Sequence, residues 1–313
     1  MTQTTRRAVI DVGTNSVKLL VASVQGQTVE PLLEKGEQTR LGQGFYETHV
    51  LQPAAIHQTA QAVADFTTLA TQWEAATVRL IATSAARDAK NQQELVCALH
   101  AVSGLTVEVI SGQQEAEWVF RGVAADPKLR GRRVLILDVG GGSTEFIYGE
   151  GLHHTFQKSV PMGSVRLLET LRPLDPPSLA DLAGCRSWLH SFFGREVTPA
   201  LEPFLRDGGR ASTQLVGTGG TATILARMAG RLREFDREQI DGTRLTRQQI
   251  LDWMVHLWSL SLASRKKIVG LPSKRADVIL MGTAIYEAVM EQIDFAELSV
   301  STRGLRFGAL LEG

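Results

Sequence analysis

The stretch AVIDVGTNSVKLLV, residues 8–21, and the stretch VLILDVGGGSTEFIYG, residues 134–149, share one pattern. Each is an apolar strand that ends in an acid, followed by a turn of small residues and a second apolar strand. The acid, the glycine and the hydroxyl recur at matched offsets: Asp11, Gly13 and Ser16, then Asp138, Gly140 and Ser143. Such a turn presents backbone N–H groups to phosphate oxygens, and the aspartate can hold a cation that neutralises them. Two copies predict two half-domains that face each other across one phosphate site.

Composition limits the class of protein. A chain of 313 residues fits two domains, and its 33 basic and 33 acidic side chains give a net charge of zero, which argues against general nucleic-acid binding. No apolar run approaches the roughly 18 residues of a membrane span, and no apolar signal region precedes the first strand. Cys97 and Cys185 have no paired or metal-type spacing, so we expect two small buried residues in a reducing cytoplasm.

Hydrophobic periodicity predicts the same order of elements in both halves. Strands are expected at 8–12, 16–24, 28–35, 78–85 and 106–111, with helices after Pro53, through Leu95 and Leu99, and at 113–123. In the helix after Pro53, an apolar face at helical spacing is expected from Ile56, Ala60, Val63, Phe66, Ala70 and Trp73. Strands at 134–139, 144–149, 153–160, 214–219 and 297–302 repeat the order with extra helices, among them 164–171, one from Thr221 and 275–293.

The polar segment 125–133 contains Pro and Gly and marks the expected domain boundary. We therefore predict an α/β protein with one domain at 1–124, completed by a C-terminal helix at 303–313, and a second domain at 125–302. Duplicated units of this kind imply two mixed sheets with a cleft between them. The apolar face of the last helix packs either on its own core or on a partner, which leaves a homodimer open.

A third glycine turn, VGTGGTATI at residues 216–224, runs from a strand into a helix. Gly219, Gly220 and Thr221 would offer N–H groups at a helix N-terminus, which is a natural anion site. The alternative is that each glycine turn is structural, because many tight turns need Gly to reach positive φ. Three such turns in one chain favour phosphate binding.

The segment IATSAARDAKN, residues 81–91, adds a cation. Thr83 and Ser84 are expected to end a strand, with Arg87 in the first turn of the following helix. Strand-end hydroxyls and a guanidinium fork suit a phosphoryl group. The alternative is an Arg87 that pairs with a surface acid, either Asp88 or Glu94.

Three acids are placed for chemistry. Asp138 and Glu145 lie on opposite arms of the second hairpin, where both can reach the turn and hold Mg²⁺ with substrate oxygens and water. Glu115 starts a helix after a strand, at the edge where α/β folds place their chemistry, and could orient and deprotonate a water. Its alternative role is an acid favoured in a first helical turn by the helix dipole.

Taken together, these stretches resemble the exopolyphosphatase/guanosine pentaphosphate phosphohydrolase (Ppx/GppA) family, short two-domain form. That family lies within the actin-like, sugar-kinase and Hsp70-type ATPase superfamily, whose domains are ribonuclease H-like. The matching stretches run in family order over nearly the whole chain: IDVGTNSVKLLV, RLGQG (40–44), ATSAARDAKN, ISGQQEAEWVFRGV, LDVGGGSTEF, VPMGSVRL (160–167), GTGGTAT and STRGLRFGALLEG.

The resemblance implies a Mg²⁺-dependent hydrolase that removes terminal phosphate from inorganic polyphosphate, or the 5′-terminal phosphate from guanosine pentaphosphate. It implies Glu115 as the catalytic glutamate, an arginine position at Arg87, and Asp138 and Glu145 as metal ligands. We count Arg87 with the catalytic residues and add Asp11 as a further candidate ligand, with Mn²⁺ as an alternative ion and room for a monovalent cation such as K⁺. The phosphate-binding positions would be Gly13, Thr14, Asn15, Ser16, Ser84, Gly140, Gly141, Gly142, Ser143, Gly219, Gly220 and Thr221.

Two departures from the family pattern affect these expectations. The position before Glu115 is often acidic in the family and is Gln114 here, which removes a neighbouring negative charge. Long members carry a helical extension beyond the last core helix, which this sequence does not show, so we expect a preference for short polyphosphate chains. Two rival functions stay open: an ATP-dependent phosphotransferase, and a non-catalytic sensor of polyphosphate or guanosine tetraphosphate.

Overall fold

The computed structural model describes residues 4–312, and the chain divides into two compact units. Unit 1 comprises the described residues up to Arg130 together with those from Arg303 onward, and unit 2 comprises Gly131–Thr302. The C-terminal segment therefore belongs to the N-terminal unit.

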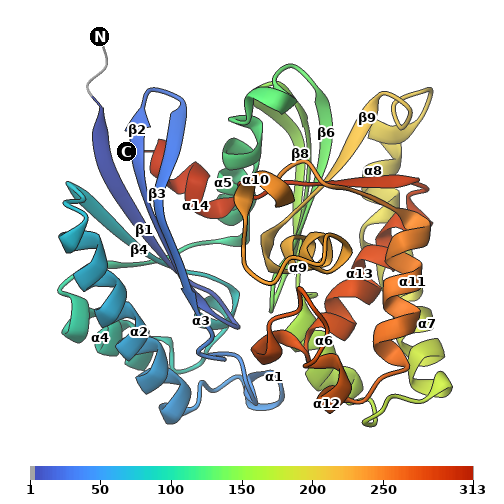
Figure 1. Ribbon diagram of the computed structural model, residues 1–313, viewed down its shortest axis with the longest axis horizontal. Helices are drawn as coiled ribbons and strands as arrows, with labels where there is room; N and C mark the ends of the chain where they lie inside the picture. Colours follow the sequence, from blue (N-terminus) through green and yellow to red (C-terminus); the bar gives the residue numbers. More distant parts are fainter. Residues whose placement is uncertain (1–3, 313) are drawn as a thin grey trace. The chain divides into compact units, whose positions relative to one another are not determined.

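Unit 1 is built on a five-stranded sheet in the order β3-β2-β1-β4-β5 (Figure 1). Its strands are β1 (Thr5–Val12), β2 (Val17–Gln25), β3 (Thr28–Glu37), β4 (Thr77–Ala82) and β5 (Val107–Val109). The first three form an antiparallel meander, whereas β1, β4 and β5 run parallel. The carboxyl ends of β1, β4 and β5 therefore meet at one edge of the sheet.

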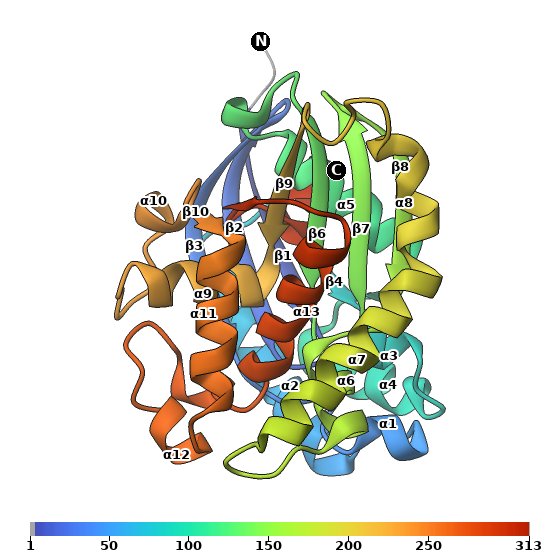
Figure 2. The same ribbon diagram turned by 90° about the vertical axis from the view of Figure 1, so that its right-hand side faces the viewer.

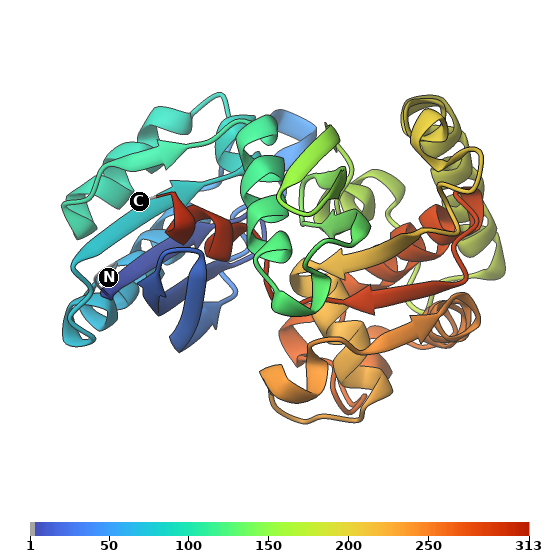
Figure 3. The same ribbon diagram turned by 90° about the horizontal axis from the view of Figure 1, so that it is seen from above.

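Helices cover both faces of this sheet. They are α1 (Phe45–Thr48), α2 (Pro53–Gln72), α3 (Ser84–Arg87), α4 (Gln92–Ser103), α5 (Gly112–Ala124), the 3₁₀ turn η1 (Pro127–Leu129) and α14 (Leu305–Leu311). Helices α2 and α4 cover one face of the sheet. Helices α5 and α14 pack against each other on the opposite face (Figure 3). The last helix thus packs on its own core, burying Leu305, Phe307 and Leu310.

Unit 2 repeats this topology. Its strands are β6 (Arg133–Val139), β7 (Thr144–Glu150), β8 (His153–Val160), β9 (Thr213–Thr218), β10 (Arg244–Thr246) and β11 (Glu297–Val300). The sheet order is β10-β11-β9-β6-β7-β8, so β8-β7-β6-β9-β11 matches β3-β2-β1-β4-β5 strand for strand. This duplicated order, with helices around each sheet, confirms the predicted α/β class of two ribonuclease H-like units.

The helices of unit 2 share one core with one face of its sheet. They are α6 (Ser164–Leu171), α7 (Leu179–Glu196), α8 (Thr198–Leu205), α9 (Gly219–Ala229), α10 (Arg237–Ile240), α11 (Arg247–Trp258), α12 (Leu262–Arg265), the 3₁₀ turn η2 (Ser273–Arg275) and α13 (Ile279–Gln292). Figure 2 shows α7, α11 and α13 in front of the sheet. Leu135, Leu137 and Val139 of β6 point into this core, so the alternate residues of β6 point to the opposite face.

Several local expectations were wrong. Helix α2 ends at Gln72, so Trp73 follows the helix as its C-cap and is 37% exposed instead of continuing the buried stripe. Strand β4 ends at Ala82, and the residues after it form the single turn α3, whose last residue is Arg87. Cys185 is buried as expected, whereas Cys97 lies on an outer face of α4 and is exposed. Among the described residues, no helix is long and apolar enough to cross a bilayer.

Candidate functional site

The two hairpin turns have the same backbone geometry. The N–H of Gly13 donates to the carbonyl of Ser16 at 3.0 Å, and that of Gly140 donates to the carbonyl of Ser143 at 3.0 Å. The residues that flank the turns differ in charge. Asp11 lies opposite Lys18 on the neighbouring strand, whereas Asp138 lies opposite Glu145.

A polar row crosses the sheet of unit 2 beside the second turn. Asp138 pairs in register with Thr218 of β9 on one side and with Glu145 of β7 on the other, and Glu145 pairs with Ser159 of β8. The Ser159 hydroxyl donates to Oε1 of Glu145 at 2.8 Å, and Glu145 is only 1% exposed. Because Leu137 and Val139 face the helical core, the Asp138 side chain projects from the opposite face.

Ser159 was not foreseen from the sequence. Its position depends on the pairing of β7 with β8, which shifts register between Tyr148 and Gly149. A strand alignment that allowed for this irregularity could have found it.

The third turn lies beside the same row. Gly219 follows β9 with φ of +80° and starts α9, and a Cβ on it would lie 2.2 Å from Oδ1 of Asp138. Only glycine therefore fits between this carboxylate and the N-terminus of α9. A Cβ on Gly220 would lie 3.7 Å from an Nη atom of Arg275, so a guanidinium flanks the same helix end. Sequence reasoning missed Arg275, because nothing in the local sequence links η2 to the third turn.

The donor set of unit 2 fits a magnesium ion. Mg²⁺ is usually held by one or two carboxylates, with substrate phosphates and water supplying the other oxygens. Asp138 and Glu145 are two carboxylates at directly opposed positions, and no cluster of three or more His, Cys, Asp or Glu suited to a metal occurs in residues 4–312. The row therefore contains two carboxylates that fit such a site, which substrate oxygens would have to complete.

The first turn is electrostatically different. Burial raises the pKa of Asp11, and the nearby charges of Lys18 and Arg306 partly counter that rise. Asp11 therefore has two cations in its surroundings within unit 1, whereas Asp138 of unit 2 lies opposite a second carboxylate. Its Oδ1 is buried without a hydrogen-bond partner among the described residues.

Other polar atoms at this edge are also unpaired. Asn15 is 5% exposed and Ser84 is 3% exposed, yet Nδ2 of Asn15 and the hydroxyl of Ser84 lack hydrogen-bond partners within the described part of the chain. The Oδ1 of the same Asn15 accepts from Nε2 of Gln38 at 3.0 Å, which fixes the amide. A buried donor without a partner costs about 1–3 kcal/mol, so these groups fit a site that phosphate oxygens complete.

The stretches 40–44 and 160–167 each pack closely against one of the turns. In unit 1 the N–H of Gly42 donates to the carbonyl of Thr14 at 2.7 Å, and a Cβ on Gly42 would lie 2.3 Å from Cγ2 of Thr14. In unit 2 the N–H of Ser164 donates to the carbonyl of Gly140 at 2.9 Å, and a Cβ on Gly163 would lie 2.4 Å from the carbonyl carbon of Gly141. These close contacts hold each turn in one conformation.

Arg87 and Glu115 form the charged pair of unit 1. Nη1 of Arg87 donates to Oε2 of Glu115 at 3.1 Å and to the carbonyl of Ile110 at 2.9 Å. Asp88 is farther, with 3.8 Å between its Oδ1 and Nε of Arg87, and Glu94 instead accepts from Asn91. Ser111 caps α5 by accepting from the N–H of Gln114, which sets Glu115 in the first helical turn.

Each unit thus gathers its predicted residues at one sheet edge. In unit 1 these are Asp11, Gly13, Thr14, Asn15, Ser16, Ser84, Arg87 and Glu115, at the carboxyl ends of β1, β4 and β5. In unit 2 they are Asp138, Gly140, Gly141, Gly142, Ser143, Glu145, Gly219, Gly220 and Thr221, around the ends of β6 and β9.

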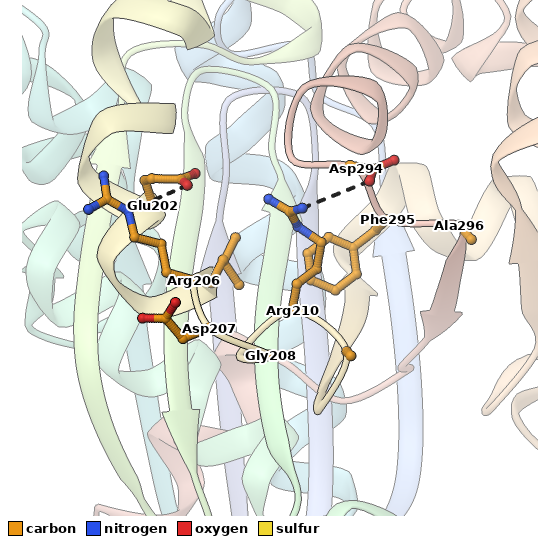
Figure 4. A pocket seen from close by; sticks show the side chains of 10 residues that line it. Glu202, Arg206, Asp207, Gly208, Arg210, Asp294, Phe295 and Ala296 are labelled. Carbon is orange, nitrogen blue, oxygen red and sulfur yellow. Dashed lines mark ion pairs between the residues drawn. The ribbon is translucent and has the colours of Figure 1, made fainter.

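A cavity of about 660 Å³ lies at the other end of the unit 2 sheet (Figure 4). Its walls carry two ion pairs, with 3.5 Å between Arg206 and Glu202 and 3.8 Å between Arg210 and Asp294. Each of these arginines is paired with an acid, so the cavity offers no preference for an anion. It lies beside the amino ends of β9 and β11, at the opposite end of the sheet from the candidate site.

Comparison with known proteins matches this chain to one family. The model of the Ppx/GppA phosphatase family matches residues 20–313. Exopolyphosphatase 2 of Mycobacterium tuberculosis is 34% identical over 98% of both chains, and exopolyphosphatase 1 of Mycobacterium bovis is 26% identical over 98% of this chain and 87% of its own.

Solved structures agree with the sequence matches. The Ppx/GppA family member from Aquifex aeolicus has a TM-score of 0.80 and 32% identity, covering 99% of this chain and 97% of its own. An exopolyphosphatase from Cytophaga hutchinsonii has a TM-score of 0.85 and 26% identity, covering 98% of both chains. With the duplicated actin-like fold, these matches show that the chain is a hydrolase that belongs to the Ppx/GppA phosphatase family.

Proposed function

We propose that this protein is an exopolyphosphatase that removes the terminal phosphate of inorganic polyphosphate by Mg²⁺-dependent attack of water. The observation that carries the proposal is the Asp138–Glu145 pair, two carboxylates on opposed strands beside a turn that offers backbone N–H groups. The names of the relatives, exopolyphosphatases 1 and 2, support the substrate.

Each group has a distinct task in the proposed reaction. Backbone N–H groups of residues 13–16 and 140–143 hold phosphate oxygens, and Asn15, Ser84 and the N-terminus of α9 add donors. Asp138 and Glu145 would hold Mg²⁺, which would supply charge neutralisation for the phosphate oxygens. Because hydrolysis of a phosphoanhydride needs little covalent help from the protein, positioning and charge stabilisation account for most of the rate.

Glu115 orients the attacking water and accepts its proton. In the free protein its carboxylate is held by Arg87 at 3.1 Å. A phosphate that binds Arg87 would compete for this guanidinium and release a Glu115 oxygen toward water. Arg87 would then stabilise charge on the phosphoryl group, because its fork can bind two oxygens at once.

Guanosine pentaphosphate is the second candidate substrate. Its 5′-phosphate chain would present the same terminal phosphoanhydride, and the family resemblance implies it as the alternative substrate. A phosphate-release assay that offers polyphosphate and guanosine pentaphosphate separately, with and without Mg²⁺, tests the proposal. We expect faster release from polyphosphate, and release only with the metal.

Other outcomes of the same assay would contradict the proposal. Faster release from guanosine pentaphosphate would make the nucleotide the main substrate. Transfer of phosphate from ATP to an acceptor, with none released from polyphosphate, would indicate a phosphotransferase. A tight complex with either compound and no turnover would indicate a sensor.

We further propose a preference for short chains. Within each unit the candidate phosphate-binding groups gather at one sheet edge, a short span that suits contact with a few phosphates at a time. Product ladders from short and long polyphosphate should therefore show distributive cleavage, with intermediates of every length. Complete digestion of long chains without intermediates would contradict this preference.

A further inference from the structure

Tyr286 lies against the line along which the adjacent strands β6 and β9 pair, which we call the seam. It belongs to α13, is fully buried, and brings its hydroxyl within 3.1 Å of the carbonyl oxygen of Leu137 and 3.2 Å of that of Thr218. Both oxygens are acceptors, so the single hydroxyl proton serves two carbonyls from adjacent strands.

The polar row of unit 2, which contains the proposed metal ligand Asp138, crosses this seam. Leu137 precedes Asp138 on β6, Thr218 precedes Gly219 on β9, and Asp138 pairs in register with Thr218. The strand pairing stops here, because Gly219 turns away with φ of +80° to start α9. The Tyr286 hydroxyl therefore joins the two strands by side-chain hydrogen bonds at the point where their pairing stops.

The surroundings keep the ring and its proton in place. A Cβ on Gly217 would lie 3.1 Å from Cε1 of Tyr286, so the missing side chain at Gly217 lets the ring reach the seam. Burial, and secondarily the Asp138 carboxylate, raise the pKa of the Tyr286 hydroxyl well above its ordinary value. The protonated hydroxyl is the form that donates to the two carbonyls.

We propose that Tyr286 is a positioning residue that fixes the Asp138 carboxylate and the Gly219 turn by pinning the backbones of β6 and β9 from the helical side of the sheet. Tyr286 touches neither metal nor substrate and acts only through these two carbonyls. The inference rests on the proposed role of Asp138 in metal binding. Groups that orient metal ligands typically change metal affinity by about 10- to 100-fold when they are removed.

The test is the affinity for Mn²⁺ alone, measured by electron paramagnetic resonance and by competition with Mg²⁺, without substrate. Tyr286→Phe removes only the hydroxyl and should weaken Mn²⁺ binding by about tenfold or more. The matched control is Thr283→Val, one turn earlier on α13, where a fully buried hydroxyl donates to the carbonyl of Ile279 in its own helix. It should leave Mn²⁺ affinity unchanged.

Asp138→Asn separates this inference from the proposed function. If Asp138→Asn loses Mn²⁺ and Tyr286→Phe binds it like the wild type, the positioning role is overturned while the metal assignment stands. If Thr283→Val weakens binding as much as Tyr286→Phe, general loosening of α13 explains the loss and the positioning role is again overturned. If Asp138→Asn binds Mn²⁺ like the wild type, the metal assignment itself fails, and this inference with it.

Discussion

Glu115 is 9% exposed, and one of its carboxylate oxygens accepts a hydrogen bond from Arg87. From the sequence alone, its position in a first helical turn was equally well explained by the helix dipole. A dipole-favoured acid needs neither burial nor a guanidinium partner, and glutamate is rarely buried unless it is paired. The pairing at the carboxyl edge of the sheet therefore favours the catalytic interpretation.

The first residue-scale prediction concerns this carboxylate. Glu115→Gln keeps the side-chain volume and should keep the fold and polyphosphate binding, while phosphate release falls by about 100-fold or more because the base is lost. Steady-state phosphate release and equilibrium polyphosphate binding check both parts. Glu117→Gln is the control, because Glu117 pairs with Arg121 on the same helix and should not affect turnover. Near-wild-type release by Glu115→Gln would remove it from the base role.

The second concerns Gly219. Alanine there would place its Cβ 2.2 Å from Oδ1 of Asp138, so we expect the carboxylate to move and activity to fall by at least about tenfold. Gly208→Ala is the control, because Gly208 has a similar φ of +85° with nothing within 4 Å of the added carbon. Both variants should lose about 1 kcal/mol of stability from the positive φ. Equal activities in the two variants would show that backbone strain alone matters.

Among the elements, the two hairpins were the most predictable. Alternating apolar residues and a small-residue turn determine the register of neighbouring strands, so Asp138 could be placed opposite Glu145 from the sequence. Ser159 and Arg275 could not be placed, because one depends on a register shift between β7 and β8 and the other on tertiary packing of η2. The sequence also predicts that the strand extends through Thr83 and Ser84, because they follow the apolar β pattern that ends at Ala82. In the structure, α3 begins at Ser84 instead.

An element-scale prediction follows from the contact between α5 and α14. A Cβ on Gly308 would lie 1.8 Å from the carbonyl oxygen of Trp118, so the two helix backbones touch. Gly308→Ala should destabilise the protein by about 1–3 kcal/mol in urea unfolding, because the helices must separate. Gly184→Ala in α7 has open space and should stabilise it by up to about 1 kcal/mol. A Gly308→Ala variant as stable as the wild type would show that α14 shifts without cost.

At the scale of the whole molecule, one topology occurs twice with different charges. The strand order and turn hydrogen bond are repeated, yet Asp11 lies opposite Lys18 where Asp138 lies opposite Glu145. The first unit thus has a neutral pair and unpaired hydrogen-bond donors, and the second has two carboxylates. This difference in charge could be predicted from the sequence, because the short hairpin turns determine which residues of the two strands lie opposite each other. Substrate choice was not readable, since no described loop identifies itself as a guanine pocket.

The last prediction concerns the stability of the molecule as pH changes. Glu287 of α13 is 3% exposed, with Oε1 bound by Arg186 at 2.7 Å and Oε2 lacking a hydrogen-bond partner among the described residues. Burial raises its pKa above the ordinary 4.5, and Arg186 offsets the rise only in part. The folded state therefore binds this proton more tightly than the unfolded state. The resulting stability is fully present below the unfolded pKa and is lost as pH rises through the folded pKa.

Glu287→Gln removes this pH dependence and keeps an acceptor for Arg186. Relative to the wild type, the variant should gain on the order of 1 kcal/mol in unfolding free energy between about pH 4 and about pH 8. Urea unfolding across that range measures the difference, with the exposed Glu30→Gln as a control that should stay within about 0.5 kcal/mol of the wild type throughout. A difference that is flat with pH would mean that Arg186 fully compensates the burial of Glu287. A difference that favours the wild type as pH rises would mean that the ion pair with Arg186 outweighs burial and that the pKa of Glu287 is lowered instead of raised.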